Sequence, residues 1–177
     1  MAAPEFVDRL NAHVALEFGA SQQYVAIAVY YESETLPRLA AFFYAQALEE
    51  RNHALMMIRY LLDAGAEPAI PGVAPPEHGF TDVVTPVSQA LAQERRVTDQ
   101  INALAALARE HGDYTSEQFM QWFIKEQVEE VATMSDLLRI VERAREDPLR
   151  AEEYLAREAL GDGGEDPTAP PVAGGSL

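Results

Sequence analysis

Apolar residues recur with helical spacing along four long segments of the chain and one shorter segment. The first segment, at about 4–31, carries a seven-residue repeat made of Leu10, Glu17, Tyr24 and Tyr31. The other segments lie at about 37–64, 85–111, 116–145 and 147–160. Prolines near the starts of segments and Gly65 after the second are common boundary signals, and Thr35 and Thr85 suit helix starts. The pattern therefore predicts an all-α protein.

The lengths of the connections predict how these helices are arranged. Short links near 32–36 and 111–115 make the first two helices antiparallel, and likewise the third and fourth. The loop at about 65–85 can span up to ~66 Å, more than the ~42 Å length of a 28-residue helix. The second and third helices are then parallel. We expect one domain over 1–160, namely a four-helix bundle (about 4–145) with one long crossover and a short fifth helix (147–160), followed by a flexible Gly/Pro-rich tail at 161–177.

The second helix is apolar around most of its circumference. Its predicted inward stripe is Leu39, Phe43, Gln46, Glu50, His53, Met57 and Tyr60. Further apolar residues lie off that stripe: Phe42, Leu48, Leu55, Met56 and Leu62. A helix that is apolar on several sides is buried on more than one side. We therefore expect a second subunit to pack against it.

Composition narrows the class of protein. The chain has 177 residues, no cysteine and a formal net charge of −16. Disulfides and thiolate metal ligands are excluded, and so acidic a surface repels nucleic acid and anionic lipid. No apolar run approaches the ~20 residues that a membrane span needs, and the N-terminus does not read as a signal peptide. We expect a cytoplasmic protein with neither a nucleic acid nor a membrane as partner.

The predicted inward stripes become polar near the middle of each long helix. The polar positions are Glu17, Glu50, His53, Glu94, Glu126 and Glu130, the last two within a fourth-helix stripe of Phe119, Phe123, Glu126, Glu130, Thr133, Leu137 and Ile140. Buried carboxylates need compensation, and the stripes contain no lysine or arginine. Bound metal ions are the remaining solution. Oxygen ligands with one imidazole suit iron or manganese better than tetrahedral zinc.

Each motif also has an ordinary explanation. A single Glu-x-x-His or a run such as KEQVEE is common on a solvated helix face, and Tyr24 and Trp122 are residue types found in many cores. What favours a metal site is the coincidence of polar positions from four helices at one depth of the bundle.

These motifs resemble the prokaryotic non-haem ferritins, particularly the actinobacterial ones, over about residues 6–160. The resemblance rests on Glu17 with Tyr24, EERNH at 49–53, Glu94 in QERRVTDQ, and QWFIKEQVEE in the fourth helix. It implies that Glu17, Glu50 and His53 bind one iron ion and that Glu50 bridges to a second ion held by Glu94 and Glu130. It also implies a third iron site at Glu49, Glu126, Glu129 and Glu130. Gln127 would hydrogen-bond at the centre, Tyr24 would be a redox-active tyrosine, and Trp122 would be an electron donor.

The resemblance implies a ferroxidase that oxidises Fe(II) with O2 or H2O2 and mineralises the product inside a homo-24-mer. Arg51 stands where bacterioferritins place a haem-binding methionine, so haem is not expected. The fourth helix lacks the histidine of a second Glu-x-x-His. Acidic residues around the turn between the third and fourth helices, Glu110, Asp113 and Glu117, could line iron entry.

Three alternatives remain open. The first is a di-iron oxygenase or peroxide reductase, and the second is a non-catalytic cage subunit. The third concerns the C-terminal AGGSL, which is similar to peptides that dock ferritin-like proteins into encapsulin shells; an unattached end is the interpretation that we favour.

Overall fold

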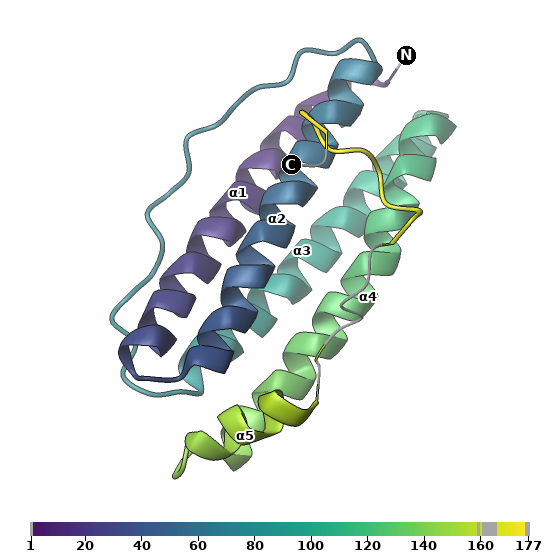
Figure 1. Ribbon diagram of the computed structural model, residues 1–177. Coiled ribbons are helices and arrows are strands. Elements are labelled where there is room, and N and C mark those ends of the chain that lie inside the picture. The colour runs from purple at the N-terminus through teal and green to yellow at the C-terminus, as the bar shows by residue number, and fades with distance from the viewer. Residues whose placement is uncertain (1, 159, 161–165, 176–177) are drawn as a thin grey trace.

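The computed structural model describes residues 2–158, 160 and 166–175, and in them the chain is entirely helical apart from its loops. The helices are α1 (Pro4–Ser33), α2 (Pro37–Asp63), α3 (Thr85–Glu110), α4 (Tyr114–Arg143) and α5 (Leu149–Arg157). The first four lie side by side as a bundle and α5 packs across one end (Figure 1). The predicted all-α four-helix bundle with a short fifth helix is confirmed, although α5 ends at Arg157 rather than near 160. None of the described helices combines the length and apolar character that crossing a bilayer requires.

The crossover loop between α2 and α3 runs along the whole bundle, so these two helices are parallel (Figure 1). Gly65 adopts a φ of 74°, which lets the chain turn sharply after α2. Two amide side chains of α1 hold the loop by paired hydrogen bonds to its backbone. Asn11 contacts Glu67 and Ala69, and Gln23 exchanges two bonds with Glu77, of 3.0 and 2.8 Å.

Two predicted helix caps are wrong. Helix α3 begins at Thr85, but the free backbone N–H groups of Val84 and Thr85 both donate to the carboxylate of Asp82, at 2.9 Å. Thr35 lies outside α2 with a φ of 61° and does not cap it. Glu152 of α5 accepts those hydrogen bonds instead, from the backbone N–H groups at the start of α2. The cap of α2 comes from a residue more than 100 positions away, which a local pattern cannot reveal. Asp82, by contrast, lies just before α3, so a local pattern could have indicated it.

The core consists of two apolar clusters separated along the bundle by a polar layer. One cluster lies towards α5 and includes Tyr24, Tyr31, Phe43 and Leu137. The other lies towards the opposite end and includes Phe6, Leu10, Val14, Ile58, Leu61, Leu104 and Phe123. The interruption falls at the mid-helix level of all four long helices, as the sequence predicts.

The inward face of α4 is rotated relative to the predicted stripe. Its buried residues are Ser116, Met120, Phe123, Gln127, Glu130, Met134, Leu137 and Val141. Phe119, Glu126, Thr133 and Ile140, which were predicted to face inward, are only half-buried. The predicted stripe began one residue early, so Gln127 points into the core and Glu126 lies at its edge.

The described part of the tail packs against the bundle instead of extending freely. Asp166 accepts hydrogen bonds from Nε1 of Trp122 (3.1 Å) and from Nζ of Lys125 (3.0 Å). The backbone N–H of Ala173 donates to the carbonyl of Leu55, at 3.1 Å. This segment crosses α4 and α2 (Figure 1). Residues 161–165 and 176–177 lie outside the described residues, so part of AGGSL does as well.

The tail changes the interpretation of the apolar outer face of α2. The tail packs beside Leu55 and Met56, so these two apolar side chains are covered by residues of the same chain. Leu48 and Leu62 remain 62% and 53% exposed. These two positions and the half-buried Phe42 are left for the subunit contact that the sequence led us to expect.

Candidate metal centre

The polar layer brings together five buried side chains from the four long helices. They are Glu17 from α1, Glu50 and His53 from α2, Glu94 from α3 and Glu130 from α4. None is more than 4% exposed. Each sits near the middle of its helix, so antiparallel pairing places all of them at one level of the bundle.

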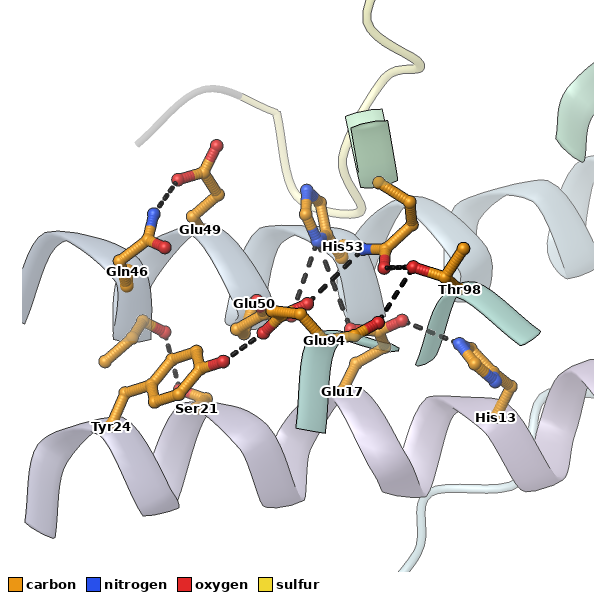
Figure 2. Close-up of polar contacts among 12 residues, drawn as sticks. His13, Glu17, Ser21, Tyr24, Gln46, Glu49, Glu50, His53, Glu94 and Thr98 are labelled. Carbon is orange, nitrogen blue, oxygen red and sulfur yellow. Dashed lines mark hydrogen bonds and ion pairs between the residues drawn. The ribbon is translucent and has the colours of Figure 1, made fainter. Parts of the chain in front are cut away.

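These five residues form two overlapping groups, each with ligand atoms within 4.8 Å of one another. The first group is Glu17, Glu50 and His53, and the second is Glu50, Glu94 and Glu130. Within the first, Nδ1 of His53 lies 3.5 Å from Oε2 of Glu50 and 4.0 Å from Oε2 of Glu17. Because Glu50 belongs to both groups, two cations held here would share it. Figure 2 shows Glu17, Glu50, His53 and Glu94 of these groups.

A third group lies on the side of the layer that faces the tail. Its members are Glu49, His53, Glu126 and Glu130. Glu49 and Glu126 are half-buried and line an open cavity of about 300 Å³ together with Trp122 and Asp166. Glu129, which the resemblance implied as a third-site ligand, belongs to none of the three groups, whereas His53 does.

Burial opposes the ionisation of most of these carboxyl groups. It raises the pKa of Glu50 and of Glu130 well above the usual range, and neighbouring carboxylates add to the effect. It also raises the pKa of Glu94 to about 7. Glu17 differs: burial alone would raise its pKa, but the hydrogen bond and charge of His13, together with Glu50 and His53, lower it to about 2. Burial therefore favours the protonated form of three of the four buried carboxyl groups in the metal-free protein, and an incoming cation has to displace those protons.

The centre has unused acceptor atoms but, among the described residues, no lysine or arginine to satisfy them. Oε2 of Glu17 and Oε1 of Glu50 are buried and accept no hydrogen bond. Among the described residues, no lysine or arginine pairs with any of the four buried glutamates. Buried unpaired acceptors are costly. Cations that prefer oxygen ligands with one imidazole fit this donor set.

Hydrogen bonds from outside these groups orient Glu94. Tyr24 donates its phenol hydrogen to Oε1 of Glu94. Nε2 of Gln127 lies 3.5 Å from Oε2 of the same carboxyl group, and Thr98 donates to Oε1 of Gln127 at 2.8 Å. Tyr24 and Gln127 were singled out from the sequence. Thr98 was missed, although it stands one helical turn after Glu94 and its spacing could have indicated it.

Comparison with known proteins agrees with this geometry. A ferritin-like domain matches residues 7–144. The chain is 55% identical to ferritin BfrB of Mycolicibacterium smegmatis, over 95% of this chain and 92% of that protein. It is 32% identical to a bacterial non-heme ferritin of Staphylococcus aureus, over 91% of this chain and 96% of that protein. The chain belongs to the ferritin family.

The fold of this ferritin is also shared with archaeal relatives. It matches an open pore ferritin from the hyperthermophilic archaeon Archaeoglobus fulgidus with a TM-score of 0.84, at 24% identity, covering 88% of this chain and 98% of that one. A humanized archaeal ferritin gives a TM-score of 0.85 at 23% identity, with 90% and 100% coverage. The resemblance to prokaryotic ferritins inferred from the sequence is confirmed. Family membership makes this chain an iron-storage protein.

Other residues singled out from the sequence are not members of the buried layer. Trp122 packs edge-to-face against His53, with ring centroids 5.7 Å apart, and Arg51 is exposed on the outside of α2. Two of the acidic residues near the turn have local partners. Asp113 caps α4 through Ser116, and Glu117 pairs with Arg109. These contacts explain both residues without a role in iron entry.

Proposed function

We propose that this ferritin is a ferroxidase, which binds two Fe(II) ions side by side and oxidises them before storage. The observation that carries the proposal is the pair of buried ligand groups that share Glu50, with oxygen atoms that no protein group satisfies. An apolar core would be more stable here than a cluster of carboxyl groups. Their burial is therefore best explained by an ion that they bind.

In this proposal each ion has its own ligands and one shared ligand. Glu17 and His53 hold the first ion, Glu94 and Glu130 hold the second, and Glu50 bridges them. Tyr24 and Gln127 fix the carboxyl group of Glu94 by hydrogen bonds. Because four helices supply the ligands, the bundle sets the separation of the two ions before iron arrives.

The ligand set favours oxidation of the bound iron. Anionic oxygen ligands stabilise Fe(III) over Fe(II), because the harder ion with the higher charge gains more from them. Two Fe(II) ions supply two electrons. O2 accepts them with two protons to give H2O2, or H2O2 accepts them with two protons to give two water molecules.

The third ligand group gives the oxidised iron a route out of the buried layer. Glu130 and His53 belong both to the buried layer and to this group, and Glu49 and Glu126 extend it to the open cavity. Fe(III) can therefore move by exchange of ligands rather than by release into an apolar core. We retain Glu129 as a ligand reached later on this route, since it lies next to Glu130 on α4.

We also propose that the chain assembles into the homo-24-mer that the family resemblance implies, with the mineral inside. The exposed Leu48 and Leu62 support a subunit contact along α2, because they lie on one face of that helix. Storage requires such an enclosure, since Fe(III) released from a monomer would precipitate in solution.

The test combines native mass with aerobic Fe(II) oxidation, for the wild type and for Glu50→Ala. Loss of the shared ligand removes an oxygen from both ions, so we expect oxidation to fall at least 100-fold while the native mass remains that of a 24-mer. Glu142→Ala, an exposed residue of the same type on α4, is the matched control and should oxidise iron normally. A monomeric or dimeric wild type, or oxidation indifferent to Glu50, contradicts the proposal. An oxidised organic product would indicate a di-iron oxygenase instead.

A further inference from the structure

A hydrogen bond within α1 links the buried layer to a residue outside all three ligand groups. Nε2 of His13 lies 2.8 Å from Oε1 of Glu17, one helical turn away. Both side chains are buried, at 3% and 1% exposure. A carboxylate oxygen only accepts, so Nε2 of His13 carries the hydrogen and donates it.

This bond makes the two oxygens of Glu17 unequal. Oε1 is engaged by His13, whereas Oε2 is buried and accepts no hydrogen bond. Oε2 lies 4.0 Å from Nδ1 of His53, on the side of the first ligand group. Figure 2 shows His13 reaching Glu17 from further along α1, while His53 approaches it from α2.

The terminal torsion of a glutamate has no sharp preference of its own. Without His13, the carboxyl group of Glu17 could turn either oxygen, or neither, towards His53 and Glu50. A single donor on Oε1 selects the orientation in which Oε2 is free.

An ordinary stabilising pair does not account for this arrangement. Replacing a buried polar pair by apolar side chains of similar volume is often neutral or stabilising. A pair selected for stability would also satisfy the remaining oxygen, since nearly all buried polar atoms in proteins have a partner. The other hydrogen-bonding neighbour of Glu17 is the carboxyl group of Glu50, itself a member of the ligand group, and no described residue outside the ligand groups donates to Oε2.

We propose that His13 is a positioning residue for one of the two metal ions, because it holds Oε1 of Glu17 and so presents Oε2 to the ion shared with Glu50 and His53. The inference rests on the proposed function. It predicts an effect on one ion only, since the donors that orient Glu94 at the other ion, Tyr24 and Gln127, are separate from His13. Loss of such an outer partner typically weakens metal binding about 10–100-fold.

Co(II) binding to the assembled, metal-free protein tests this without any oxidation step. The visible absorption of bound Co(II) is recorded while the metal is titrated into the wild type, His13→Leu and His13→Gln. Leucine cannot donate, whereas the amide of glutamine can reach a carboxylate four residues on. We expect His13→Leu to bind one of the two Co(II) ions about 10–100-fold more weakly than the wild type. His13→Gln should bind both ions with nearly wild-type affinity.

Thr98→Val is the matched control, because Thr98 holds Gln127, which contacts the carboxyl group of Glu94 at the other ion. Any loss that it causes should fall on the other Co(II). If His13→Leu does not assemble, His13→Asn replaces it, since its amide is one methylene too short to reach Glu17.

Three results overturn the inference: unchanged binding in His13→Leu, equal losses in the leucine and glutamine variants, or equal weakening of both ions. These three results can be told apart from the results that would refute the proposed ferroxidase function. A wild type that binds no Co(II) pair and does not oxidise Fe(II) would refute the ferroxidase itself. A wild type that does both, with His13→Leu indistinguishable from it, would refute only the role of His13.

Discussion

Tyr24 on α1 donates its phenol hydrogen to Glu94 on α3, and so joins a buried aromatic ring directly to the metal centre. Burial and the surrounding carboxyl groups raise the pKa of Tyr24 well above its usual value. The phenol therefore stays protonated and available as a donor at any physiological pH. In the proposed ferroxidase, this contact makes Tyr24 the ring from which we expect an electron to reach the oxidant.

We predict two separable consequences of Tyr24→Phe. The variant loses a hydrogen bond to Glu94, so the second ion should bind about 10-fold more weakly. It also loses the only phenol bonded to the centre among the described residues. Wild-type protein mixed with a few Fe(II) ions per subunit and O2 should give a tyrosyl radical signal in electron paramagnetic resonance, and the variant should not. A signal of equal size in Tyr24→Phe would place the radical on another residue.

Metal binding should strengthen as pH rises through neutrality. Glu94 has a pKa of about 7, and Glu50 and Glu130 have pKa values well above the usual range, so these groups hold protons that a cation must displace. Calorimetric titration with Co(II) at pH 6.5 and 7.5, in buffers of different ionisation enthalpy, counts the protons released. We expect more than one proton per pair of ions at pH 6.5.

Glu94→Gln serves as the control for that count. Its amide does not titrate, so the variant should release about one proton fewer at pH 6.5 and bind the second ion more weakly. Proton release that is the same in the variant and the wild type would mean that Glu94 is already ionised in the metal-free protein.

The sequence predicted which residues meet in the buried layer better than it predicted what surrounds them. Glu50 and His53 were found because helical spacing fixes which residues of one helix share a face, and because link lengths fix the order of helices. His13 was missed although its spacing to Glu17 is equally local, because the predicted repeat of the first helix, which contains Leu10 and Glu17, does not include it. Asp166 had no local signal, because 44 residues separate it from Trp122. The predicted inward stripe of α4 was offset because residues at the edge of its buried face, such as Phe119, were placed at the centre of that face.

Docking of the tail can be followed through Trp122, the single tryptophan of the chain. Its Nε1 donates to Asp166, and segment 166–175 covers the neighbouring face of α2 and α4. Truncation after residue 160 should expose the indole to water and shift its fluorescence emission to longer wavelength. Asp166→Ala should give part of the shift, because it removes both the indole partner and the partner of Lys125. Thr168→Ala, which removes only a turn hydrogen bond to Asp166, is the control. Unchanged emission after truncation would contradict the docked position.

The final prediction concerns the stability of the metal-free protein. Glu130 is 4% exposed, its pKa is raised well above the usual range by burial and by Glu50 and Glu94, and no basic residue among those described pairs with it. Replacing buried ionisable groups by apolar ones often adds about 1–4 kcal/mol. For a chain of this size each kcal/mol raises the unfolding midpoint by roughly 2–4 °C. Glu130→Leu should therefore unfold at a higher temperature than the wild type when both are metal-free.

The same substitution should reverse its effect once metal is present. A bound metal ion stabilises the folded state more when it binds more tightly. Glu130→Leu removes one of the side chains that would hold the second ion. Calorimetric scans with and without Co(II) should show a large upward shift of the unfolding temperature for the wild type and a small one for the variant.

Burial of Glu94 also makes the stability of the metal-free protein depend on pH. The metal-free wild type should lose stability as pH rises from about 4.5 to about 7, because the folded state retains the Glu94 proton over that window while the unfolded chain has released it. A variant less stable than the wild type in the absence of metal would mean that Glu130 contributes to packing, and that its burial does not depend on a bound cation.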